Sequence, residues 1–150
     1  MPNIANKTIE KVLSYNFKNK SILKLALTHS SIKQNPNSYE RLEFFGDSIV
    51  GFIVSEWLYK KEKKLDQGKL TVLKNTLVSR KNMSLIAKEM NLIKYAIIHK
   101  SVDLDSQTVV NRINSDLYES IVAAIYLDSN YLTVKDFIYK TLLAFKSIKE

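Results

Sequence analysis

The stretch YERLEFFGDSIVGFIVSEWLYKKE, residues 39–62, predicts one long helix of about six turns. Glu43 and Asp47 are four residues apart, so both carboxylates project from one face of this helix, and Glu40 lies on the same stripe. Like charges at this spacing repel one another among strongly apolar neighbours, and Gly46 adds a helix penalty of about 1 kcal/mol relative to alanine. The stretch therefore indicates a bound cation and the close approach of another backbone.

A second pair of carboxylates, Asp116 and Glu119, lies three residues apart within the apolar run 113–127. Two helices that each carry such a pair can face each other, so the four carboxylates can converge on one cation. Oxygen ligands suit Mg²⁺ or Mn²⁺, and a chain with no cysteine and two histidines is a poor zinc binder. The alternative, that each pair is simply solvated at a helix edge, stays open at this point.

The rest of the chain also has helical periodicity, and three glycines and two prolines leave few strand turns, so we predict an all-α domain. Asn6 or Thr8 is expected to cap a first helix that ends near Tyr15. Ser21 and Ser79 are expected to cap later ones. The predicted helices cover residues 21–29, 39–62, 67–77, 79–90 and 109–127, with a last one from Thr133; a polar loop is expected at 30–37.

The charge indicates a polyanionic partner. The chain carries a formal net charge of +8, and residues 11–39 contain five lysines and no acid. A lysine-rich composition can also reflect a biased genome, since only three of the 23 basic residues are arginines. Outside the basic segments 11–39 and 60–100, the acids gather largely in two places, 40–56 and 103–128. Enzymes that cut phosphodiesters need this combination of lysines for the substrate backbone and carboxylates for the metal.

No run of about 18 apolar residues is present, and the first twenty residues contain no apolar core of a signal peptide. We therefore expect an intracellular protein, cytoplasmic rather than membrane-bound.

Residues 40–48, ERLEFFGDS, closely resemble the signature of the ribonuclease III family, E-R-L-E-F-L-G-D-[SA]. Residues 25–31 resemble the family's A-L-T-H-x-S turn, residues 68–79 its G-x-L-[ST]…L-V-S segment, and residues 116–128, DLYESIVAAIYLD, its second acidic helix. The resemblance covers about residues 9–145 in the family's order.

The resemblance implies a compact all-α catalytic domain that forms a two-fold homodimer and cuts double-stranded RNA with Mg²⁺, for which Mn²⁺ can substitute. Each protomer would cut one strand, leaving a 5′ phosphate and a short 3′ overhang. The alternative is an enzyme that forms half of a heterodimer and cuts one strand. The catalytic metal ligands that carry over by position are Glu43, Asp47, Asp116 and Glu119, and Asp47 and Glu119 are the strongest candidates for direct contact.

Other family positions imply supporting roles. Glu40 falls where the family has a further acid near the dimer interface. Phe44 matches an aromatic residue that enters a pocket of the partner protomer, although a core position is the alternative. Phe45, also assigned to the interface, stands where leucine is usual.

Three further residues carry open interpretations. Gln67 replaces the glutamate that normally begins the middle motif, and an amide cannot act as a general base or a charged ligand. Arg112 lies one turn before Asp116 and either clamps the scissile phosphate or only pairs with that carboxylate. His29 is expected to be structural rather than catalytic.

Residues 1–150 are expected to form the catalytic domain alone, without the double-stranded-RNA-binding domain that bacterial relatives usually carry. RNA affinity would then come from the domain's own lysines or from a separate RNA-binding partner. The competing hypothesis is a ribonuclease III-like module that has lost cleavage and only binds RNA or the ribosome.

Overall fold

The computed structural model describes residues 4–32 and 38–145. Its elements in chain order are α1 (Ile4–Leu13), α2 (Lys20–Leu27), α3 (Tyr39–Lys61), α4 (Gln67–Leu77), α5 (Arg80–Glu89), the 3-10 turn η1 (Leu92–Tyr95), α6 (Gln107–Asp128), α7 (Tyr131–Ile138) and the π-helical turn η2 (Tyr139–Leu143). Within the described residues, pairing of strand type is limited to one isolated bridge between Thr28 and Ile97, so the predicted all-α class is confirmed. No described helix is both long and apolar enough to cross a membrane.

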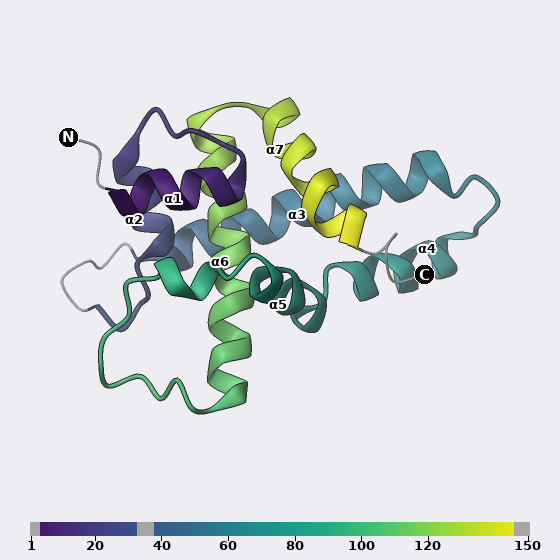
Figure 1. Cartoon of the computed structure of the whole chain (residues 1–150). Helices are drawn as coiled ribbons and strands as arrows, with labels where there is room; N and C mark the ends of the chain where they lie inside the picture. Colours follow the sequence, from purple (N-terminus) through teal and green to yellow (C-terminus); the bar gives the residue numbers. More distant parts are fainter. Residues whose placement is uncertain (1–3, 33–37, 146–150) are drawn as a thin grey trace.

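Helix α6 is the centre of the fold. Every residue from Ile113 to Ile125 is buried, which explains why this segment reads as a nearly continuous apolar run. Figure 1 shows α6 running through the middle of the molecule, with α3 crossing it and the other helices grouped around the two. The functional carboxylates of the sequence analysis are therefore carried by the two helices that form the core crossing.

Gly46 allows α3 and α6 to cross at very short range. A Cβ atom at this position would lie 1.8 Å from the backbone oxygen of Glu119, a distance that no side chain can occupy. The glycine predicted to mark a close backbone approach therefore does so, and the helix penalty that it brings is offset by the contact it permits.

Beyond the crossing, α3 continues outward and α4 runs back beside it, so the two helices project from the body as an arm (Figure 1). A groove of about 700 Å³ lies along this arm, and its lining includes Phe52, Tyr59 and Gln67. The side chains of Phe52 and Tyr59 are exposed.

The helix boundaries test the expected caps. The start of α3 at Tyr39, the range of α4 and the cap of α5 by Ser79 are confirmed. The caps expected at Asn6 and Thr8 are wrong, because α1 already begins at Ile4. Ser21 is not a cap either. Instead the side chain of Asn19 accepts a hydrogen bond from the Ser21 amide.

The last helix likewise begins earlier than Thr133, because the side chain of Asn130 accepts from the Thr133 amide and starts α7 at Tyr131. Asparagine is an N-cap as good as serine, and propensity alone does not rank the two. The loop predicted at residues 30–37 falls largely outside the described residues, which omit 33–37.

Asp128, the last residue of α6, ties the N-terminal helices to the core. Its carboxylate accepts hydrogen bonds from the hydroxyl of Tyr15 at 2.6 Å and from the backbone amides of Lys18 at 2.8 Å and Asn19 at 2.9 Å. The turn between α1 and α2 is thus held against the end of α6 by a charged acceptor with three donors.

Candidate active site

Three carboxylates meet where α3 crosses α6. Glu43 of α3 and the residues Asp116 and Glu119 of α6 each place one oxygen within 4.8 Å of the others. Asp116 is 5% exposed and Glu119 is 6% exposed, whereas Glu43 is half-buried. The close contact at Gly46 is what brings the two helices near enough for the group to form.

The electrostatics of this group favour a cation. Burial, together with the charge of Asp116 and a hydrogen bond to it, raises the pKa of Glu43 to about 7. Burial and the neighbouring Asp47 raise the pKa of Glu119 to about 9, and burial also raises the pKa of Asp116. Each carboxyl is held away from its ionised form because like charges crowd a dehydrated site.

Hydrogen bonding leaves the same site unsatisfied. The Oδ2 atom of Asp116 accepts a long hydrogen bond of 3.4 Å from the hydroxyl of Tyr39. Its Oδ1 atom is buried and has no hydrogen-bond partner among the described residues. A buried carboxylate oxygen without a donor is rare in folded proteins and fits a bound ion. The residues present thus fit a divalent cation with oxygen ligands, such as Mg²⁺.

Asp47 stands at the edge of this group rather than within it. It is exposed, and the set of three converging carboxylates does not include it. It is nevertheless near Glu119: protonated Glu119 can donate a hydrogen bond to Asp47, and the charge of Asp47 raises the pKa of Glu119. Of the four carboxylates predicted as ligands, the structure brings three together and places Asp47 against one of them.

Two arginines flank the carboxylates. The Nε atom of Arg112 lies 3.8 Å from the Oδ2 atom of Asp116, and its side chain is 70% exposed. Arg80, the first residue of α5, acts together with Arg112 to oppose the rise of the pKa of Glu43 and of Asp116. Arg80 was not predicted as a site residue from the sequence. The available signal was that arginine is rare in this lysine-rich chain.

The remaining supporting residues are more distant. Glu40 is exposed in the first turn of α3 and lies outside the converging set. Gln67 is the first residue of α4 and lies seven residues, about 10 Å of helix, before Lys74, the α4 residue that lines a pocket together with Asp47. Within one chain, Gln67 is therefore not brought to the carboxylates.

His29 has contacts that suit a structural residue. Its ring packs edge-on against Tyr39 at 5.4 Å, and its Nδ1 atom hydrogen-bonds to the hydroxyl of Ser31. Burial lowers its pKa, although the charges of Asp116 and Glu40 oppose this change. The histidine thus helps to fix Tyr39, which itself contacts Asp116.

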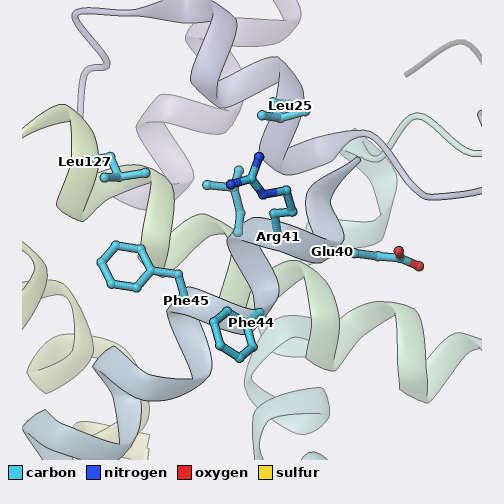
Figure 2. Close-up of a pocket in the computed structure, with 7 residues that line it drawn as sticks. Leu25, Glu40, Arg41, Phe44, Phe45 and Leu127 are labelled. Carbon is cyan, nitrogen blue, oxygen red and sulfur yellow. The ribbon is translucent and has the colours of Figure 1, made fainter. Parts of the chain in front are cut away.

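Phe44 and Phe45 border an apolar pocket of about 730 Å³ on the outer side of α3, whose lining also includes Leu25 and Leu127. Phe44 is 78% exposed and Phe45 is 36% exposed, so the alternative that Phe44 belongs to the core does not hold within one chain. Figure 2 shows Phe45 and Leu127 near each other at this pocket, and Glu40 pointing away from them.

Comparison with known proteins places this site in a family. Residues 19–145 match the family described as ribonuclease-III-like. The chain belongs to this family. The nuclease domain of ribonuclease III from Campylobacter jejuni has the same fold, with a TM-score of 0.85 and 32% identity over 97% of both chains. The resemblance inferred from the sequence is thereby confirmed.

Two further ribonuclease III relatives extend the comparison. A second structure of the Campylobacter jejuni domain, described as flexible in a region involved in dimer formation, has a TM-score of 0.83 and 33% identity over 94% of this chain and 99% of that one. Ribonuclease 3 of Aliarcobacter butzleri is 39% identical over 134 residues, which are 89% of this chain and 59% of the relative. The chain thus spans about three fifths of that relative's length.

Proposed function

We propose that the protein is a Mg²⁺-dependent endonuclease that cuts double-stranded RNA during RNA processing and leaves a 5′ phosphate and a short 3′ overhang. The observation that carries this proposal is the buried group of Glu43, Asp116 and Glu119, with an unpartnered carboxylate oxygen, in a domain that matches a ribonuclease III nuclease domain over almost its whole length. We further propose a cytoplasmic location, where RNA precursors are processed.

In this proposal the acidic residues bind the metal and the basic residues bind the RNA phosphates. The three converging carboxylates and Asp47 hold the cation, which would supply a Lewis acid at the scissile phosphate. Arg112 and Arg80 both act on the charge of this group, and each guanidinium can bind phosphate oxygens with two parallel hydrogen bonds. The hydroxyl of Tyr39 donates a hydrogen bond to Asp116 and so orients its carboxylate. The basic surface of the chain neutralises the remaining phosphates of the duplex.

A homodimer supplies one such site for each strand. Phe44 projects from α3 next to an apolar pocket on the same face. In a two-fold interface, the same surface of each copy contacts that of the other. Phe44 of each protomer can therefore enter the apolar pocket of the partner. Burying a phenylalanine side chain contributes about 1.5–3 kcal/mol per site.

The dimer is tested with Phe44→Asp, measured by light scattering across a range of concentrations. The matched control is Leu104→Asp, because Leu104 is also exposed but lies in the segment before α6. We expect Phe44→Asp to be monomeric at concentrations where the control and the parent protein are dimeric. A parent protein that stays monomeric would argue for a heterodimer or another arrangement.

The catalytic proposal is tested by incubating a long RNA duplex with the purified protein in Mg²⁺, in Mn²⁺ and in EDTA, beside Asp47→Asn. We expect metal-dependent shortening that Asp47→Asn loses. Binding of duplex RNA at low salt without cleavage would instead favour the module that has lost catalysis. In that case Gln67→Glu, and addition of a separate double-stranded-RNA-binding protein, are the next measurements.

A further inference from the structure

A second pocket adjoins the carboxylates on the side of the arm. It has a volume of about 480 Å³ and lies between α3 and α4, and its polar lining includes Asp47, Ser48, Lys74 and Asn75. The volume is that of a small-ligand site. Asp47 is shared between this pocket and the carboxylate group, so the two sites are neighbours.

Lys74 enters this pocket across the backbone of α3. Its Cε and Nζ atoms lie 3.7 and 3.9 Å from the point that a Cβ atom on Gly51 would occupy. Gly51 is four residues after Asp47, about 6 Å of helix rise, so Lys74 crosses α3 about one turn beyond the residue that borders the carboxylate group.

The ammonium group of Lys74 has no counter-charge of its own. Among the described residues, the ion pairs of the other arm lysines use Glu56 and Asp66, and none includes Lys74. Lys74 is also half-buried, unlike the exposed Lys60 and Lys69. A half-buried, unpaired cation costs solvation free energy unless an anion joins it.

The same pocket offers neutral donors. The hydroxyl of Ser48 and the amide of Asn75 are exposed and make no hydrogen bond within the described part of the chain. Ser55, by contrast, already donates to the carbonyl oxygen of Gly51 at 2.7 Å. One ammonium group and two free polar side chains form a set that suits the two unesterified oxygens of a phosphodiester.

We propose that this pocket binds the phosphodiester next to the one that is cut, with Lys74 as the charged contact. The inference rests on the proposed function for the identity of the polymer, but the chemistry of the pocket requires only a phosphodiester anion. The site fixes the position of the RNA strand along α3, because one phosphate is held at the metal site and its neighbour one helical turn away.

The first test uses dimethyl phosphate in EDTA, followed by the backbone amide signals of Gly51 and Asn75 in NMR spectra at constant ionic strength. The variants are Lys74→Gln and the control Lys69→Gln, which removes the same charge from the same helix outside the pocket. We expect both amide signals to move in the parent protein and in Lys69→Gln, and to move at least fivefold less in Lys74→Gln. Signals that do not move in the parent, or that move equally in Lys74→Gln, would overturn the proposal.

The second test measures duplex RNA affinity across a series of salt concentrations. Losing one phosphate contact weakens binding uniformly and lowers the salt slope by about one. We expect Lys74→Gln to bind about 3–10-fold more weakly, Lys74→Arg to recover most of the loss, and Lys69→Gln to change less than twofold. Equal affinities and slopes for the two glutamine variants would overturn the proposal. A parent protein that neither binds nor cuts duplex RNA would refute the proposed function alone, since the dimethyl phosphate test still decides the pocket.

Discussion

Helix α6 carries one carboxylate at its C-terminal end and two in its middle, and the surroundings of the two places differ. Asp128 at its C-terminal end accepts three hydrogen bonds, from Tyr15, Lys18 and Asn19. Burial alone would raise the pKa of Asp128, but these donors lower it below its ordinary value. About three turns earlier, Asp116 and Glu119 are crowded by other carboxylates and their pKa values are raised, and the Oδ1 atom of Asp116 has no hydrogen-bond partner within the described part of the chain.

This difference distinguishes a structural anion from a ligand. A carboxylate that is surrounded by donors stabilises the fold by itself. A carboxylate that is buried among other carboxylates destabilises the folded protein until a proton or a cation neutralises it. Among the residues that the structure describes, the second arrangement occurs where α3 crosses α6, and that place is where the proposed chemistry requires it.

The largest expected effect comes from Glu119→Gln, which should separate activity from stability. We expect the cleavage rate to fall at least about a thousandfold, because the cation loses a ligand. In EDTA above neutral pH the same variant should be more stable than the parent protein, because glutamine is neutral whether the chain is folded or unfolded, whereas Glu119 must take up a proton, or be buried as an anion, when the chain folds. Single-turnover cleavage and thermal unfolding measure the two effects. Glu89→Gln, an exposed carboxylate on α5, serves as the control. A rate above about one tenth of the parent's would exclude Glu119 as a ligand.

Gly46→Ala should disrupt the crossing of α3 and α6, which brings the three carboxylates of the active site together. The new methyl group would meet the backbone of Glu119 rather than a flexible side chain, so we expect a loss of about 3–5 kcal/mol in the free energy of unfolding. Gly51→Ala is the matched control, since a Cβ atom there makes only ordinary contact with Lys74. It should stabilise α3 by about 0.5–1 kcal/mol. Urea titration measures both, and equal stabilities would show that the crossing can relax around a methyl group.

Much of this organisation could be predicted from local sequence. The spacing of Glu43 and Asp47, the apolar setting of Asp116 and the central glycine all depend on the period of one helix, so they can be read without the fold. The charges and the family motif then indicate a metal site. The ends of the helices were harder to predict, because serine and asparagine cap helices equally well. Asn19 rather than Ser21 caps α2.

Relations between distant segments could not be predicted in this way. The position of Lys74 over Gly51 depends on how α4 folds back along α3, and the approach of Arg80 to the carboxylates depends on where α5 begins. The separation of Gln67 from the carboxylates follows from the length of the arm. Asp47 is exposed and lies outside the set of three converging carboxylates, and one helix period specifies neither property.

Asp128→Asn changes the structural carboxylate at the C-terminal end of α6 and should affect stability rather than cleavage. The amide keeps the shape of the carboxylate but weakens three hydrogen bonds from Tyr15, Lys18 and Asn19. We expect the free energy of unfolding to fall by about 1–2 kcal/mol and the cleavage rate of the folded protein to stay within about twofold. Urea unfolding and initial cleavage rates test this pair of outcomes. A large loss of rate at full stability would mean that Asp128 communicates with the active site.

The smallest effect is a shift of the melting temperature with pH. Glu119 has an ordinary pKa near 4.5 when unfolded and about 9 when folded, so the folded protein binds the extra proton between these values. The stability contributed by this protonation is complete below pH 4.5 and is lost as the pH rises toward 9. In EDTA, the melting temperature of the parent protein should therefore fall more steeply between pH 6 and pH 9 than that of Glu119→Gln.

Mg²⁺ should reverse this trend, because a cation binds the ionised carboxylates and displaces the protons. At millimolar Mg²⁺ we expect the melting temperature to rise by about 4–8 °C at pH 8 and by less than about 2 °C at pH 5.5. Glu119→Gln should show little increase at either pH, whereas Asp128→Asn should show the full increase from a lower starting point. An increase that is independent of pH would mean that Mg²⁺ binds at surface carboxylates with ordinary pKa values, and the contrast between the two ends of α6 would then not concern metal binding.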